Sequence, residues 1–302
     1  MTAAPHWSVM VPAFGRGAFL EQTLRSVLDQ GASPDQMQIT VVENPSECQD
    51  IAQILARLQS PQVEHIRHLQ NLGMIGNWNY CVQHARGELV HILHDDDYVL
   101  PGFYRKVEDA AARRSDCGLF ITRCIEVDEA GALERLSPRL PGLEKSAREV
   151  QELLTDNGIR CPGVVVRSSA YRSVGAFMEE IAYTADWDMW FRLIKASGAA
   201  VLNEPLAAYR CRRDNMSSVM ARSGEMARAH GLMAERLAAA DARLDRAEAR
   251  SAAAWRAAFL AGDFARRGDA EAARANEVIW REFARPRDRI IRLLRRWLGR
   301  GQ

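Results

Sequence analysis

The sequence predicts an α/β protein with parallel βαβ units, because short apolar strands alternate with helical segments along its first hundred residues. The expected strands are residues 7–11, 38–42, 63–67 and 89–93, and the expected helices between them are residues 19–30, 50–58 and 77–85. Farther along, strands are expected at residues 118–127, 164–166, 200–202 and 207–209, and residues 133–143 are expected to form a loop because they contain two prolines. From about residue 219, alanine and arginine dominate and glycine becomes rare. We therefore expect an α/β domain followed by a C-terminal α-helical extension.

Length and composition limit the broad class of the protein. The chain has 302 residues, is 47% hydrophobic and carries a net charge of +1. This is enough for one large domain with an appendage or for two domains, and the near-zero charge argues against a general nucleic-acid binder. The six cysteines form no CxxC pair, no secretory signal opens the chain, and no apolar run of about 18 residues occurs. These features predict reduced thiols and a cytoplasmic location.

An acidic cluster follows the strand expected at residues 89–93. Asp95, Asp96 and Asp97 are consecutive carboxylates, and carboxyl ends of strands in open α/β sheets are where ligands bind. A divalent cation would relieve their mutual repulsion, since hard oxygen ligands suit Mg²⁺ or Mn²⁺. A solvated acidic turn or a helix N-cap is the structural alternative. The loop PAFGRG after the first strand has neither GxGxxG nor GxxxxGK[ST], so a carboxylate-held metal is the available way to neutralise a phosphate.

The C-terminal third divides into two segments. Residues 219–284 read as helices that form a hairpin or bundle, which either packs on the α/β domain or serves oligomerisation, including a homo-oligomer. Residues 285–302 contain a basic amphipathic helix, because Arg285–Arg300 holds seven arginines and one aspartate, a net charge of +6. Such a helix suits an anionic membrane surface. The alternative is a terminal helix docked on the body with its arginines in water.

Seven segments of residues 7–218 together resemble family 2 of the inverting glycosyltransferases with the GT-A fold. They are SVMVPAFGRGAFLEQTLRSVLDQ, VVENPS, NLGMIGNWNYCVQHARGE, LVHILHDDDYVLPGFY, VGAF, ADWDMWFRL and YRCRRDNMS. Their order and spacing make the match specific. The resemblance implies a Rossmann-like, mixed, mainly parallel sheet flanked by helices in residues 1–218. It also implies sugar transfer from a nucleotide-diphosphate donor, usually with Mg²⁺ or Mn²⁺, and inversion of the anomeric centre.

The resemblance assigns nucleotide-sugar contacts to the loops that follow the first three strands. The residues that match the family's donor-binding positions are Pro12, Ala13, Phe14, Arg16, Glu43, Asn44, Asn71, Gly73 and Asn77. Those after the first strand lie along the nucleoside, and Arg16 is placed to touch base or phosphate. Glu43 and Asn44 match paired acidic positions that hold uracil or ribose.

The acidic cluster matches the DxD region of the family. Counting back from Pro101, His94 occupies the usual first Asp position and Asp96 aligns with the metal-binding carboxylate. Asp95 and Asp97 flank it, and the resemblance implies Asp96 and Asp97 as metal ligands and Asp95 and Asp96 as donor contacts.

Two further motifs complete the predicted site. Asp186 matches the catalytic base, although Ala185 replaces the glutamate that usually precedes it. A carboxylate aimed at the acceptor hydroxyl can fill this role, and a helix N-cap is the alternative for Asp186. In YRCRRDNMS, Arg212 stands where the family has histidine, and arginine pairs with phosphate oxygens but cannot bind a metal.

These matches predict a hexosyltransferase-like enzyme. It transfers a sugar, UDP-linked on this interpretation, to a glycan or lipid-linked acceptor in surface polysaccharide biosynthesis. One alternative is a sugar-nucleotide-binding partner protein without transferase activity, because the usual glutamate and histidine are replaced. Another is a nucleotidyltransferase, for which PAFGRG is a poor phosphate loop.

Overall fold

The computed structural model describes residues 5–15, 17–46, 51–140, 157–212 and 215–298. Contacts within the chain divide it into two units. The first is Met1–Leu143 with Gly158–Cys211, and the second is Glu144–Asn157 with Arg212–Gln302. The division after Cys211 lies seven residues before the boundary expected at residue 218.

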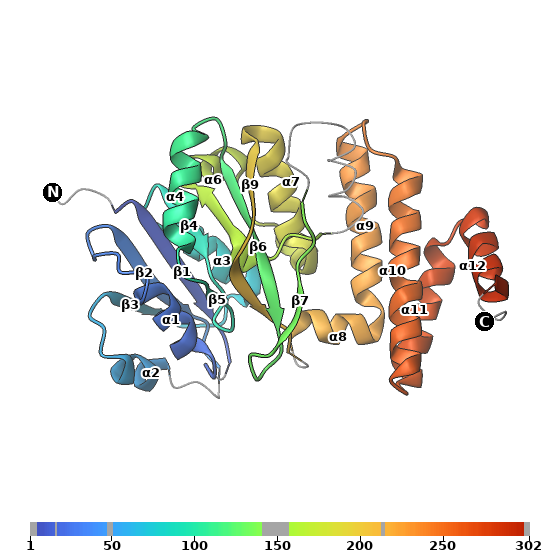
Figure 1. Ribbon diagram of the computed structural model, residues 1–302, viewed down its shortest axis with the longest axis horizontal. Helices are drawn as coiled ribbons and strands as arrows, with labels where there is room; N and C mark the ends of the chain where they lie inside the picture. The colour runs from blue at the N-terminus through green and yellow to red at the C-terminus, as the bar shows by residue number, and fades with distance from the viewer. Residues whose placement is uncertain (1–4, 16, 47–50, 141–156, 213–214, 299–302) are drawn as a thin grey trace. The chain divides into compact units, whose positions relative to one another are not determined.

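The described strands of the first unit form one nine-stranded mixed sheet (Figure 1). They are β1 (Trp7–Ala13), β2 (Met37–Glu43), β3 (Val63–Arg67), β4 (Leu89–Ile92), β5 (Tyr98–Val99), β6 (Leu119–Val127), β7 (Leu133–Leu136), β8 (Val164–Arg167) and β9 (Ala199–Arg210). Their order is β3-β2-β1-β4-β8-β6-β9-β5, with β7 added to β6. Strands β1 to β4 are parallel to one another, whereas β8 runs antiparallel to β4 and β6. The expected mixed α/β fold is confirmed.

Helices cover both faces of this sheet (Figure 1). They are α1 (Leu20–Leu28), α2 (Ile51–Leu58), α3 (Gly73–His84), α4 (Phe103–Arg113), α6 (Ser168–Val174) and α7 (Ala185–Ser197), with short 3₁₀ turns η1 (Cys161–Gly163) and η2 (Glu179–Thr184). Val9 and Val11 pack in the cluster that contains the apolar side chains of α1, α2 and α4. Met10, on the other face of β1, packs with Cys81 of α3. Burial on both faces explains why β1 and β2 are apolar along most of their length.

The structure differs from the predicted elements in three places. Residues 133–136, expected in a loop, form edge strand β7 because the tight turn at Asp128–Gly131 brings them back against β6. The strands expected at 200–202 and 207–209 are one strand, β9, whose register against β6 shifts near Pro205. A proline that cannot donate to the ladder fits such an irregularity. Helix α3 begins at Gly73, four residues before the expected start.

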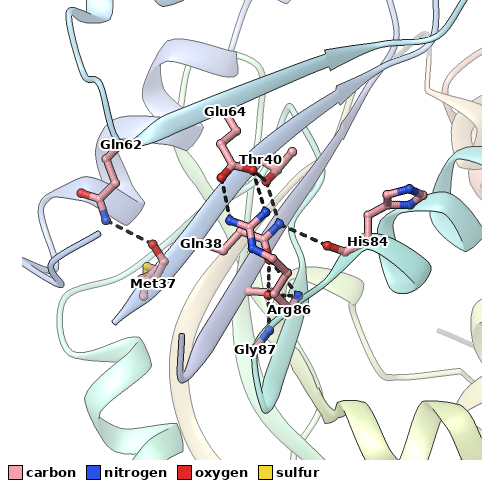
Figure 2. A network of polar contacts seen from close by, with 9 residues as sticks. Met37, Gln38, Thr40, Gln62, Glu64, His84, Arg86 and Gly87 are labelled. Atoms are coloured by element: carbon pink, nitrogen blue, oxygen red, sulfur yellow. Dashed lines mark hydrogen bonds and ion pairs between the residues drawn. The ribbon is translucent and has the colours of Figure 1, made fainter. Parts of the chain in front are cut away.

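A polar network that runs from the buried Ser8 and Gln38 to the exposed Glu64 fixes the amino-terminal edge of the parallel strands (Figure 2). Ser8 Oγ donates to Gln38 Oε1 (2.6 Å) and accepts hydrogen bonds from the backbone N–H groups of Arg86 (2.9 Å) and Gly87 (2.7 Å). The Arg86 guanidinium pairs with Glu64 at 2.6 Å. Gly87 lies so close to β1 that a Cβ there would be 2.5 Å from the Trp7 carbonyl carbon. These contacts align the starts of β1, β2 and β4, so their carboxyl ends also lie together.

The second unit is helical within its described residues. Its helices are α8 (Met216–Ser223), α9 (Glu225–Ala240), α10 (Arg246–Arg266), α11 (Ala270–Phe283) and α12 (Pro286–Leu298). Alanines of α9 and α10 pack with Trp280 and Phe283 of α11 in one apolar cluster. Asp245 and Asp269 accept backbone hydrogen bonds at the starts of α10 and α11, which is the usual role of an N-cap aspartate. None of the helices within the described residues is both long and apolar enough to span a bilayer.

Helix α12 packs through its polar side. Asp288 is 1% exposed and accepts hydrogen bonds from Ser251 Oγ of α10 and from the backbone N–H of Arg285 (3.0 Å). Arg292 pairs with Glu277 of α11 (2.7 Å), and its guanidinium lies 4.1 Å from the centroid of a Trp280 ring. Its exposed aliphatic side chains are Ile290 (58%), Ile291 (39%), Leu293 (66%) and Leu294 (54%). In this segment Arg285 and Arg292 are half-buried and Arg287 and Arg289 are exposed, and the aliphatic side chains lie at the surface.

Candidate active site

The carboxyl ends of β1, β2 and β4 are joined by hydrogen bonds. The Phe14 N–H donates to Asp95 Oδ2 (3.1 Å), and the Asn44 N–H donates to Ala13 O (2.9 Å). The Phe14 side chain is 59% exposed, while Ala13 is buried. Three loops that are distant in the sequence thus meet at one edge, where the Phe14 ring is exposed and the Phe14 backbone is bonded to the Asp95 carboxylate. Arg16, expected in the same loop, lies outside the described residues.

Glu43 and Asn44 have different surroundings at the end of β2. Glu43 is 2% exposed, and its carboxylate lies 2.7 Å from His65 Nε2 and 3.3 Å from Arg67 Nε, both on β3. Asn44 Nδ2 donates to Gly73 O (2.9 Å), and its Oδ1 accepts from the Leu72 N–H (3.1 Å). The Glu43 carboxylate therefore fastens β2 to β3, and Asn44 holds the loop that leads into α3.

The remaining predicted donor residues shape the start of α3. Asn71 is exposed, and its Oδ1 accepts a hydrogen bond from the Gly73 N–H (2.8 Å). Gly73 has φ +74°, a conformation that a side chain would strain. Asn77 is buried, where its Nδ2 donates to Val42 O (3.0 Å) and its Oδ1 lies 3.1 Å from His68 Nε2. Asn71 and Gly73 are therefore exposed at the surface, whereas the Asn77 side chain is buried.

The three aspartates occupy a turn between β4 and β5 and are not equivalent. Asp95 and Asp96 are half-buried, whereas Asp97 is 1% exposed. Asp97 Oδ1 accepts from the Arg210 N–H (2.9 Å), and its Oδ2 lies 3.6 Å from His94 Nδ1. The turn does not begin a helix, so the N-cap alternative is wrong, and the buried Asp97 is not part of a solvated turn. Asp97 ties β5 and β9 together, which leaves Asp95 and Asp96 nearer the surface.

The surroundings of Asp97 and His94 perturb both groups. Burial raises the pKa of Asp97 to about 6. Burial lowers the pKa of His94, but the neighbouring Asp97 carboxylate and Cys161 thiol outweigh it, so that this pKa lies well above its usual value. The His94 ring also stacks on Trp78, with centroids 5.1 Å apart. His94, at the position where the family usually has its first aspartate, is thus held among Trp78, Asp97 and Cys161.

Two of the three carboxylates in this turn suit a divalent cation that also binds a phosphate. Within the described ranges, no three His, Cys, Asp or Glu side chains are grouped to hold a metal ion. Mg²⁺ in phosphate-transfer sites is usually bound by only one or two carboxylates together with substrate phosphates and water. The half-buried carboxylates of Asp95 and Asp96 fit that donor set, whereas the carboxylate of Asp97 is almost fully buried and fits it less well.

Asp186 lies in the first turn of α7. The N-cap of this helix is Thr184, so Asp186 is the second helical residue and the N-cap alternative is wrong. Asp186 Oδ1 accepts a hydrogen bond from the Trp187 N–H (2.7 Å). Burial raises the pKa of the Cys161 thiol, and the carboxylates of Asp186 and Asp97 raise it further. The electrostatic influence of both carboxylates on one thiol indicates that Asp186 and Asp97 each lie near Cys161.

Helix α7 is held by contacts on its other residues. Asp188 is buried and accepts from Arg192 Nε (2.6 Å), while the Arg192 guanidinium donates to Val174 O (2.7 Å) and Ala176 O (3.0 Å). Trp187 and Trp190 are 3% and 2% exposed, so they are core residues and not a sugar platform. These contacts anchor α7, the helix that carries Asp186 in its first turn.

Arg212 is the first residue after the division between the units. It is half-buried, and its backbone carbonyl accepts a hydrogen bond from Ser218 Oγ. Asn215 of the same motif is the N-cap of α8 and accepts from the Ser218 N–H (2.8 Å). The motif thus starts α8, and the phosphate contact of Arg212 stays a prediction.

Three residues near the acidic turn were not assigned a role from the sequence. Arg210 is 2% exposed and contacts the turn, Thr23 Oγ1 lies 2.7 Å from Asp97 O and 3.2 Å from Asp95 O, and Cys161 lies beside His94. Thr23 has the spacing of an apolar core position, and Cys161 is a single thiol in a short apolar segment. Only Arg210 had a local signal, because it lies within the YRCRRDNMS segment.

A model of the family "Glycosyl transferase family 2" matches residues 8–172, which is more than half of the chain. The chain belongs to glycosyl transferase family 2. This glycosyltransferase is 30% identical over 223 residues to an uncharacterized protein of Mycobacterium tuberculosis, covering 69% of this chain and 68% of the relative. It is also 25% identical over 206 residues to an uncharacterized glycosyltransferase of Methanocaldococcus jannaschii, covering 66% and 69%.

Solved structures share the fold of this glycosyltransferase. S. aureus TarS, residues 1–349 in complex with UDP-GlcNAc, has a TM-score of 0.60 at 18% identity, covering 86% of this chain and 72% of that chain. A mannosyltransferase from Pyrobaculum calidifontis in complex with GDP-Man and Mn²⁺ has a TM-score of 0.60 at 15% identity, covering 92% and 88%. At these identities the comparison establishes the GT-A fold.

Proposed function

We propose that this enzyme transfers a hexose from a UDP-sugar to a glycan or lipid-linked acceptor, with inversion, in surface polysaccharide biosynthesis. The proposal is supported by one observation: the Cys161 thiol lies within electrostatic range of both Asp97 of the β4–β5 turn and Asp186 of α7, so carboxylates of two elements lie near the same residue. Carboxylates from two elements suit two separate tasks, holding the donor diphosphate and accepting a proton.

On this proposal the donor binds along the ends of β1 and β2. The exposed ring of Phe14 offers a stacking surface for the base. Asn71 and the loop held by Asn44 are proposed to line the side of the nucleoside site. The carboxylate of Glu43 pairs with His65 and Arg67, so we propose that Glu43 affects base or ribose binding indirectly, by fixing the position of β2. Arg16 and Arg212 are proposed to contact phosphate.

The diphosphate is proposed to bind beside Asp95 and Asp96, with Mg²⁺ or Mn²⁺ held chiefly by Asp96. The ion, when bound, neutralises charge on the departing diphosphate. Asp97 acts on the same turn by fixing its backbone to β9. Asp95 in turn orients the loop after β1 through the Phe14 N–H.

Asp186 is proposed to accept the proton of the acceptor hydroxyl as that oxygen attacks the anomeric carbon. The attack comes from the face opposite the diphosphate, so one displacement inverts the centre and no enzyme nucleophile is required. The hydrogen bond from Trp187 N–H and the buried Asp188–Arg192 pair keep this carboxylate in place.

A donor panel tests the enzyme against a sugar-nucleotide-binding protein without activity. We expect UDP-sugars with Mn²⁺ to raise the melting temperature more than GDP-sugars, and one of them to be turned over to UDP. Hydrolysis in the absence of acceptor gives the first readout, and transfer to a membrane glycolipid extract gives the second. Binding without metal-dependent turnover would support the non-enzymatic alternative, and release of pyrophosphate from a sugar phosphate and UTP would support a nucleotidyltransferase.

We further propose that α12 binds an anionic bilayer, which would bring the enzyme to a lipid-linked acceptor at the inner face of the plasma membrane. Residues 285–300 carry a net charge of +6, and the aliphatic side chains of Ile290, Leu293 and Leu294 are more than half exposed. Apolar groups on one side of a basic helix partition into the headgroup boundary. These few exposed aliphatic side chains suit binding at the surface of a bilayer and do not require a helix that spans it.

We expect the protein to float with vesicles that contain phosphatidylglycerol, and a variant with Ile290, Leu293 and Leu294 all changed to serine to lose at least about 90% of this binding. The matched control changes the exposed Leu232, Phe259 and Val278 of the other helices to serine. If the α12 variant floats like the wild type, the membrane proposal is wrong. If the wild type is a dimer in gel filtration and the α12 variant is a monomer, the exposed aliphatic side chains of α12 form a homo-oligomer contact.

A further inference from the structure

The side chain of Arg210 lies beneath the acidic turn at the end of β9. It is 2% exposed, and its guanidinium donates to Asp96 O (3.0 Å), Asp128 O (3.1 Å), Glu129 O (3.3 Å) and Gln22 Oε1 (2.7 Å). All four acceptors are neutral oxygens, three of them backbone carbonyls. A buried cation is costly unless its donors are satisfied, so a guanidinium in this position depends on its fork geometry.

The four acceptors of Arg210 belong to three separate elements. Gln22 is on α1, Asp96 is in the β4–β5 turn, and Asp128 and Glu129 are in the β6–β7 turn. The Arg210 backbone N–H reaches the same acidic turn through Asp97 Oδ1 (2.9 Å). One residue therefore holds the turn by a carbonyl of Asp96 and by the carboxylate of its neighbour.

Aromatic rings fix the guanidinium between these acceptors. Its central carbon lies 4.1 Å from the centroid of the Phe19 ring and 5.6 Å from that of the Tyr98 ring. Stacking of this kind suits the planar arginine fork, and an ammonium group cannot reproduce it together with four divergent hydrogen bonds. A lysine here would keep the charge and lose most of the geometry.

We propose that Arg210 is a positioning residue that fixes the Asp96 carboxylate where it can bind the metal ion of the metal–diphosphate complex. It acts through the backbone of Asp96 and through Asp97, and it touches neither metal nor donor. The inference rests on the proposed function of this site as a metal–diphosphate site. Partners of this kind behind a metal ligand typically change metal affinity or activity about 10- to 100-fold when they are replaced.

The test measures UDP binding by calorimetry at increasing Mn²⁺ concentration. We expect Arg210→Lys to need at least about tenfold more Mn²⁺ than the wild type for half-maximal UDP binding. The matched control is Arg167→Lys. Arg167 is also largely buried, donates to Cys117 O (3.0 Å) and Ala111 O (2.8 Å) and stacks on Phe120, but it ends β8 where that strand pairs with the start of β4.

The outcomes separate the two proposals. A wild type whose UDP binding does not respond to Mn²⁺ contradicts the metal–diphosphate site itself. A responsive wild type with the same Mn²⁺ requirement in Arg210→Lys overturns the positioning role. Equal loss of melting temperature in both lysine variants, with the Mn²⁺ requirement changed only in Arg210→Lys, supports it.

A milder variant keeps the test valid if Arg210→Lys does not fold. Gln22 is an exposed residue of α1 that supplies the one side-chain acceptor of the guanidinium. We expect Gln22→Ala to raise the Mn²⁺ requirement about threefold, in line with the loss of one hydrogen bond. An unchanged requirement in this variant, with Arg210→Lys insoluble, also counts against the proposal.

Discussion

Asp186→Asn is expected to lower the rate of sugar transfer by about 10²- to 10⁴-fold, the usual contribution of a general base. The asparagine side chain has the same shape, and its oxygen can still accept the hydrogen bond from Trp187 N–H. UDP-sugar binding and the melting temperature should therefore stay close to those of the wild type. The measurement is kcat for transfer, together with a thermal shift of the protein with donor.

Asp188→Asn is the matched control, since it changes a second carboxylate two residues along the same helix. Asp188 is buried against Arg192, so its replacement should lower the melting temperature while kcat at low temperature falls much less. If Asp186→Asn retains transfer within about fivefold of the wild type, Asp186 is not the base. A fall in donor affinity of the same size as the fall in rate would assign it to binding.

Asp96→Asn is expected to have the second large effect, because it replaces the carboxylate that is proposed to hold the metal. Loss of a ligand charge at saturating UDP-sugar should reduce metal-dependent turnover at least about 100-fold, and removal of metal from the wild type with EDTA should have the same effect. Addition of Mn²⁺ should restore the EDTA-treated wild type and not the variant. Steady-state release of UDP measures all three.

Asp95→Asn and Asp116→Asn calibrate this result. Asp95 should give a smaller loss, since its Oδ2 accepts from Phe14 N–H and an amide oxygen can do the same. Asp116 is an exposed carboxylate that pairs with Arg114 before β6, and its change should leave turnover unaltered. Full turnover of the wild type in EDTA would contradict metal dependence and would reassign Asp96 to direct donor binding.

The strands β1 to β4 could be predicted, and a candidate site assigned to their carboxyl ends, because both depend on local pattern. An apolar run such as Leu89–Ile92 followed by three aspartates indicates a buried strand and a loop without knowledge of any partner. The chain order of strands and helices then places Phe14, Asn44 and Asp95 at one edge.

The individual roles of the aspartates could not be predicted because they depend on residues far away in the sequence. Asp97 differs from Asp96 because its carboxylate accepts a hydrogen bond from the backbone of Arg210, which lies 113 residues later in the sequence. Glu43 pairs with His65 and Arg67 because β3 lies beside β2, and no property of Glu43 itself indicates this. Identical side chains acquire different surroundings from their packing, which the local sequence does not contain.

The ion pairs formed by the arginines of α12 determine how ionic strength should act on the protein. Arg292 and Arg287 already neutralise Glu277 and Glu248, so much of the positive charge counted along this helix is spent within the second unit. Attraction to a charged surface would then be weaker than the count implies, and attachment would depend mainly on aliphatic partitioning, which salt screens little. Concentrated salt should instead weaken the ion pairs that hold α12 on α10 and α11. The usual salt wash for peripheral proteins would then detach α12 from these helices before it released the protein from the membrane.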